Sequence, residues 1–76
     1  MIWFEAHNLN GFPAQTLSEG IEYYTHKYRQ TPNRAQLPIG TELTALSADY
    51  QEMYLETSQL VLPRHLHLTY DLKFTE

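Results

Sequence analysis

The sequence predicts a small single-domain α+β fold, a two-layer sandwich in which two helices cover one face of a sheet. Three observations favour this class. Hydrophobic and polar residues alternate near both ends of the chain, as in strands with one buried face. An apolar stripe with helical spacing lies between them, and 76 residues suffice for only one domain. We therefore expect the order β-α-β-α-β-β over residues 1–76.

The first strand and the first helix have the clearest signals. Residues 2–7 alternate and predict a strand, which the turn-forming run NLNGFP ends. Thr16 and Glu19 have the spacing of a capping box, which predicts the start of a helix, and Pro32 predicts its end. Gly20 borders the apolar stripe, so we expect the helix to lie close to the sheet there. The stripe consists of Leu17, Ile21, Tyr24 and Tyr28.

The middle of the chain has weaker signals. Residues 34–39 are extended, and Pro38, which cannot donate a backbone hydrogen bond, indicates an edge strand or a connector. Residues 41–52 predict a shorter second helix that begins near Gly40 and Thr41.

Two strand-like segments complete the fold. Residues 53–62 and 64–74 are predicted to form a C-terminal antiparallel hairpin. Its turn lies either near Ser58–Gln59 or at Pro63–Arg64, and the sequence leaves both positions open.

The composition excludes several classes of protein. The chain has no cysteine, which excludes disulfides, thiolate zinc sites and cysteine nucleophiles. No apolar run approaches the roughly 20 residues that span a bilayer, and the N-terminus lacks the pattern of a signal peptide. We therefore expect a soluble cytoplasmic protein with no membrane association. For so short a chain, self-association or a metal bound by His and carboxylate side chains is the remaining reinforcement.

The charge is unevenly distributed along the chain, whose formal net charge is −4. A basic spot, formed by Lys27, Arg29 and Arg34, precedes residues 35–63, which contain acids but no Lys or Arg. This pattern favours a basic protein partner or a second copy of the chain. Five Lys and Arg residues in all argue against general nucleic-acid binding, although docking of nucleic acid through the basic spot is a third hypothesis. The simpler interpretation of that spot is an ordinary basic helix end.

Two histidines near the C-terminus have the spacing of metal ligands. His65 and His67 leave the same face of a strand about 6.6 Å apart, and a third ligand, His7 or Glu5, is available if the first and last strands are neighbours. A metal-binding protein or small metal-dependent hydrolase that uses His7, His65 and His67 to hold zinc or another divalent transition metal is the alternative function. The simpler interpretation is that these histidines occupy the exposed face of a half-buried strand.

Catalytic motifs are scarce. Glu22 and His26 are four residues apart on the first helix and could form an acid–base couple, but an ordinary helix-surface pair explains them equally well. The sequence has neither a nucleophile elbow nor a glycine-rich phosphate loop. These absences favour a protein that is not an enzyme.

Aromatic residues are the strongest functional signal. The chain contains six tyrosines and one tryptophan, residue types enriched at binding surfaces. We predict an interaction surface formed by Trp3, Tyr23, His65 and His67, unless Trp3 closes the core instead. The leading hypothesis is a small, non-catalytic adaptor or inhibitor-like protein that needs no cofactor, binds a protein partner and forms a homo-oligomer.

Overall fold

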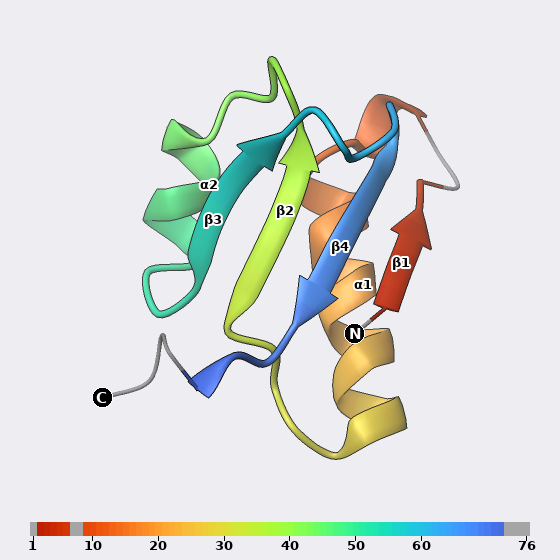
Figure 1. The fold of residues 1–76 in the computed structure, drawn as a ribbon, viewed down its shortest axis with the longest axis vertical. Coiled ribbons are helices and arrows are strands. Elements are labelled where there is room, and N and C mark those ends of the chain that lie inside the picture. The colour runs from red at the N-terminus through yellow and green to blue at the C-terminus, as the bar shows by residue number, and fades with distance from the viewer. Residues whose placement is uncertain (1, 7–8, 73–76) are drawn as a thin grey trace.

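The computed structural model, which describes residues 2–6 and 9–72, confirms the α+β class and the order of elements. The described residues form one four-stranded sheet and two α-helices, and the helices lie behind the sheet in Figure 1. In the described part of the chain, no helix is long and apolar enough to cross a membrane. The elements are β1 (Ile2–Glu5), the short 3-10 helix η1 (Leu9–Gly11), α1 (Ala14–Tyr28), β2 (Arg34–Pro38), α2 (Thr44–Asp49), β3 (Tyr54–Ser58) and β4 (His65–Thr69).

The sheet is mixed, with the strand order β1-β4-β2-β3. β4 is antiparallel to both of its neighbours, β1 and β2, whereas β2 and β3 are parallel. The parallel pair follows from the connection through α2, because a helix that crosses one face of the sheet returns the chain to the same end. Both helices lie on one face, so no described helix covers the other face (Figure 1).

The predicted C-terminal hairpin is wrong, because β2 lies between β3 and β4. Both predicted turns are nevertheless present. The Val61 N–H donates to the Ser58 carbonyl oxygen at 3.2 Å, and the His65 N–H donates to the Leu62 carbonyl oxygen at 3.1 Å. Together these turns carry the chain across the end of β2 to the far side of that strand (Figure 1).

The prediction that β2 is an edge strand or connector is also wrong. β2 lies between β4 and β3 in the sheet, and its residues Ala35 and Leu37 are completely buried. Pro38 is the last residue of β2, and β4 pairs only with Arg34–Gln36. The missing N–H of the proline therefore leaves no gap in the β2–β4 ladder.

The start of α1 differs from the predicted capping box. The helix begins at Ala14, two residues before Thr16, and its N-cap residue, Pro13, makes no side-chain hydrogen bond. Thr16 is buried within the first turn, so its hydroxyl does not act as a cap. At the other end, Arg29 adopts a left-handed conformation with φ 57°, which ends the helix before Pro32 is reached.

The predicted close approach of Gly20 to the sheet is confirmed. A Cβ atom on Gly20 would lie 3.1 Å from a methyl carbon of Leu68, 3.3 Å from one of Leu66 and 3.5 Å from a ring carbon of Phe4. The absence of a side chain therefore allows the middle of α1 to rest directly on β1 and β4.

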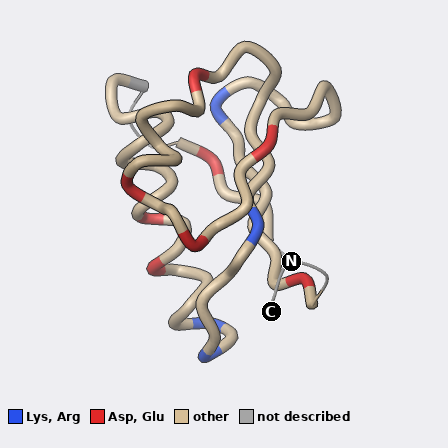
Figure 2. The backbone as a smooth tube through the Cα atoms, turned by 90° about the vertical axis from the view of Figure 1, so that its left-hand side faces the viewer, with Lys and Arg blue, Asp and Glu red and all other residues tan. Residues whose placement is uncertain are grey.

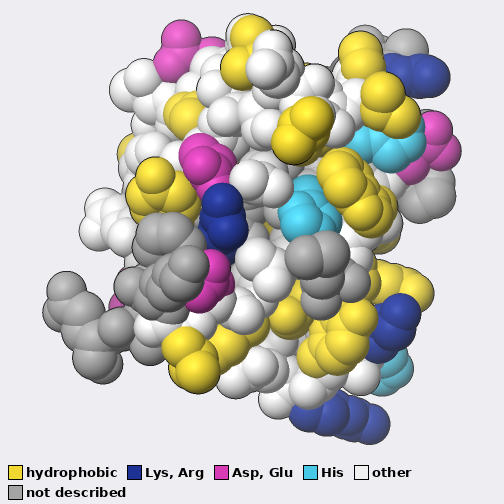
Figure 3. Space-filling model, viewed as in Figure 1, with side chains coloured by type: hydrophobic (Ala, Val, Ile, Leu, Met, Phe, Trp, Pro, Cys, Tyr) yellow, Lys and Arg dark blue, Asp and Glu magenta, His cyan; other side chains and the backbone are white. Residues whose placement is uncertain are grey.

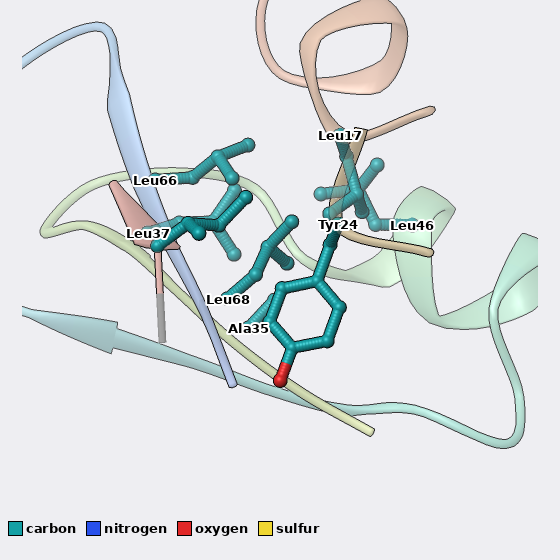
Figure 4. Close-up of a cluster of buried hydrophobic side chains, with 8 residues drawn as sticks. Leu17, Tyr24, Ala35, Leu37, Leu46, Leu66 and Leu68 are labelled. Carbon is teal, nitrogen blue, oxygen red and sulfur yellow. The ribbon is translucent and has the colours of Figure 1, made fainter. Parts of the chain in front are cut away.

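The hydrophobic core lies between the helices and the covered face of the sheet. Figure 4 shows leucines of β2 and β4 meeting side chains of α1 and α2. Ile2 belongs to this core and is 7% exposed, whereas its neighbour Trp3 is 56% exposed. The alternative in which Trp3 closes the core is therefore wrong. The buried cluster comprises Ile2, Leu17, Tyr24, Ala35, Leu37, Leu46, Leu66 and Leu68.

Candidate functional site

The uncovered face of the sheet, here called the open face, gathers most of the predicted site residues. Alternation along the strands directs every second side chain to it. Figure 3 looks onto this face and shows hydrophobic side chains beside histidines. The registers place on it Trp3 and Glu5 of β1, Arg34 and Gln36 of β2, Tyr54 and Glu56 of β3, and His65, His67 and Thr69 of β4.

Trp3 and His67 form the aromatic centre of the open face. They lie directly opposite each other on β1 and β4, and their rings stack with a centroid distance of 4.5 Å and an interplanar angle of 21°. Stacking leaves the outer side of the indole accessible, while His67 is only 8% exposed. The tryptophan is thus an exposed aromatic side chain held against a buried support.

A chain of hydrogen bonds crosses the sheet from His67. Gln36 on β2 lies between His67 on β4 and Glu56 on β3 in the register. The Gln36 amide nitrogen donates to Glu56 Oε1 at 3.1 Å, and Gln36 Oε1 lies 3.0 Å from His67 Nδ1. Arg34 Nε donates to the same Glu56 oxygen at 2.7 Å, and its guanidinium forms an ion pair with that carboxylate. These contacts hold the imidazole in one orientation.

The network also assigns the proton on His67. A carboxylate can only accept, so the NH₂ group of Gln36 must face Glu56 and its oxygen must face His67. Nδ1 therefore carries the proton, and Nε2 is the unprotonated nitrogen of the neutral ring. Nε2 is buried and has no hydrogen-bond partner among the residues that the structure describes.

The surroundings of His67 favour its neutral form. Burial lowers the pKa of His67 below its usual value of 6.5, and the positive charge of Arg34 adds to this effect. A proton on Nε2 would place a charge in a site that lacks an acceptor for it. His67 therefore serves as an uncharged support for Trp3.

The geometry required by the metal hypothesis is present only in part. β1 lies beside β4, and His65 and His67 share the open face, as that hypothesis expects. His65 Nδ1 lies 2.9 Å from the Pro63 carbonyl oxygen, and its Nε2 lies 3.5 Å from Glu5 Oε2. His7 lies outside the described residues. Within residues 2–6 and 9–72, no three His, Asp or Glu side chains are grouped as metal ligands, and a metal site with His7 stays a prediction.

The structure does not bring the predicted basic spot together. Arg34 belongs to β2 and contacts carboxylates on the open face, Glu56 and, at 3.6 Å, Asp71. Lys27 and Arg29 lie instead at the C-terminal end of α1, in the helical layer. Arg34 is therefore part of a charge network rather than of a basic surface.

Tyr23 lies on a different side of the molecule from Trp3. Its ring is 6.0 Å from that of Phe4, whose side chain lies on the helix side of β1. A shallow hollow of about 540 Å³ opens here beside β1, and it also contains the predicted couple Glu22 and His26. The predicted interaction surface therefore has two parts, separated by β1 itself.

Several surface residues had no role in the sequence analysis. Gln36 contacts His67, and Glu56 contacts Gln36, only because β2 and β3 follow β4 in the sheet, which no local pattern reveals. The loop between β3 and β4 exposes Leu60, at 82%, and Leu62, both assigned to a strand from the sequence. The sequence feature that could have indicated this exposed loop was the group of hydrophobic residues after the turn-forming pair Ser58–Gln59.

Comparison with known proteins provides no further assignment. No protein-family model, curated protein or solved structure matches this chain.

Proposed function

We propose that this protein is a non-catalytic interaction module that associates with a second copy of itself through the surface around Trp3. The observation that carries the proposal is the stack of an exposed Trp3 on a buried, hydrogen-bonded His67. An aromatic side chain held in this way loses little conformational freedom on binding, so more of its contact energy stabilises the complex.

The charges of the open face are compatible with burial in an interface. Arg34 contacts both Glu56 and Asp71, and Glu56 also accepts a hydrogen bond from Gln36. A protein that covers this face therefore meets carboxylates that already have partners. Burial of unpaired charges, which is costly, is largely avoided.

Exposed hydrophobic residues near one end of the sheet also favour a protein-binding role. Ile39, Leu60 and Leu62 are exposed near the end of the sheet where β2 and β3 finish. Exposed hydrophobic groups beside an aromatic anchor are typical of interaction sites. Association also supplies the stability that so small a core lacks, which favours a second copy as the partner.

The experiment is analytical ultracentrifugation of the wild type and of Trp3→Ala across a concentration series. The wild type should self-associate, and Trp3→Ala should shift the equilibrium towards monomer while its circular dichroism spectrum is retained. Tyr54→Ala is the matched control, because it removes an exposed aromatic side chain at the opposite edge of the sheet. A wild type that stays monomeric at every concentration would refute the proposal.

A further inference from the structure

We propose that the second copy pairs through the free edge of β1, which joins the two sheets across a two-fold axis. The inference rests on the proposed function, because it specifies how the self-association occurs. β1 is the terminal strand of the described sheet, and one of its edges is unpaired (Figure 1). A terminal strand is a ready template for another strand.

The β1–β4 register identifies the backbone groups available at this edge. The Ala6 N–H donates to the Arg64 carbonyl oxygen at 2.8 Å, in line with the pairing of Phe4 with Leu66. Backbone groups alternate in direction along an antiparallel strand. The even-numbered residues of β1 therefore bond to β4, and the N–H and C=O groups of Trp3 and Glu5 point outward.

These outward groups select one register for an antiparallel pair of β1 strands. If Trp3 lies opposite Glu5 of the second copy, both outward residues of each strand form hydrogen-bonded pairs. Phe4 then faces Phe4 of the second copy across the axis, on the helix side of the sheet. The arrangement is closed, since each copy uses its single β1 edge, and a dimer results rather than a filament.

The helix side brings polar side chains of the two copies together in the same arrangement. Phe4 lies against α1 near Gly20 and Tyr23, so the two-fold axis passes the middle of the helix. The two α1 helices then run in opposite directions, and Glu19 of one copy faces His26 of the other. Both residues line the hollow beside β1, which the second copy would cover.

The other terminal strand, β3, is less suited to pairing with a copy. It lies beside α2 in the acidic part of the chain, where residues 35–63 include no Lys or Arg. Figure 2 views this side and shows acidic residues spread along it. A pair of β3 strands would bring like charges together. Like β3, β1 carries neither proline nor lysine, the residues that commonly protect an edge.

The test blocks the outer edge of β1 without breaking its bonds to β4. Glu5→Pro removes an outward N–H, whereas Glu5→Gln removes the same charge and keeps that N–H. In analytical ultracentrifugation, Glu5→Pro should be monomeric and Glu5→Gln should still dimerise. Because proline also constrains the backbone, a synthetic chain with N-methylglutamate at position 5 repeats the block with a different residue.

Amide hydrogen exchange measured by NMR supplies an independent result. The amides of Trp3 and Glu5 should become protected as the concentration of wild-type protein rises, whereas that of Phe4 should be protected already in the monomer.

The outcomes separate this inference from the proposed function. A dimer that persists with both blocked chains but dissociates in Trp3→Ala would overturn the edge pairing and leave the proposed function in place, with the open faces in contact. A wild type that never dimerises would overturn both.

Discussion

Replacement of Gly20 by alanine should destabilise the protein by about 1 kcal/mol, although alanine is the better helix former. In an open helix the change would stabilise by about 1 kcal/mol. Here the new methyl group would lie 3.1 Å and 3.3 Å from methyl carbons of Leu68 and Leu66, which are completely buried. Overpacking of this kind costs about 1–3 kcal/mol, because the displaced side chains have no free space. The packing cost should therefore exceed the gain in helix propensity.

Urea unfolding, followed by circular dichroism, measures this effect. The midpoint should fall with no change in the slope, since the same surface is exposed on unfolding. In thermal unfolding, a loss of 1 kcal/mol corresponds to a decrease in Tm of roughly 4–8 °C for a domain of this size.

A second substitution tests the assigned cause. Leu68→Val shortens the side chain whose methyl carbon is nearest to Gly20. If crowding causes the loss, the double variant should lose less stability than the two single variants lose together, by about 0.5 kcal/mol or more. A more stable Gly20→Ala protein would show that helix propensity dominates and would refute the argument that the helix must lie so close to the sheet.

Three further outcomes are expected. Because burial lowers the pKa of His67 below 6.5, the unfolded chain takes up the proton first, and the free energy of unfolding should decrease as the pH falls below about 6.5. In urea titrations at several pH values, His67→Gln should remove this pH dependence, whereas substitution of an exposed histidine, His26→Gln, should keep it. An unchanged pH dependence in His67→Gln would contradict the assignment. Asn33→Ala removes two hydrogen bonds of 2.8 Å to the backbone of Asp71 and should cost about 1–3 kcal/mol in urea unfolding, with a loss below about 0.5 kcal/mol showing that these bonds contribute little. Zinc added after EDTA should leave Tm unchanged, since Nε2 of His67 is buried and the described residues group no three metal ligands. A rise that is lost in His65→Ala would establish the metal hypothesis instead.

The elements with a regular pattern were predictable because burial imposes a period on the sequence. Alternation in residues 2–7 correctly separated Ile2 from Trp3, and the helical stripe correctly placed Leu17 in the core. The capping box failed because α1 begins at Ala14, which places Thr16 inside the first turn with its side chain buried. Local spacing describes which groups can interact, but burial decides whether they do.

The sequence by itself determined the class of the fold and the opposite faces of Ile2 and Trp3, because these depend on neighbours along the chain. Only the structure decided which of the two residues is buried. Only the tertiary structure decided that β2 enters between β3 and β4, since strand pairing joins segments that no local period relates. That insertion places Gln36 beside His67 and Glu56 beside Gln36. The proton on Nδ1 of His67 is therefore fixed by residues from three strands of the sheet. It also leaves β1 at the edge, where its outward amides are available to a second copy.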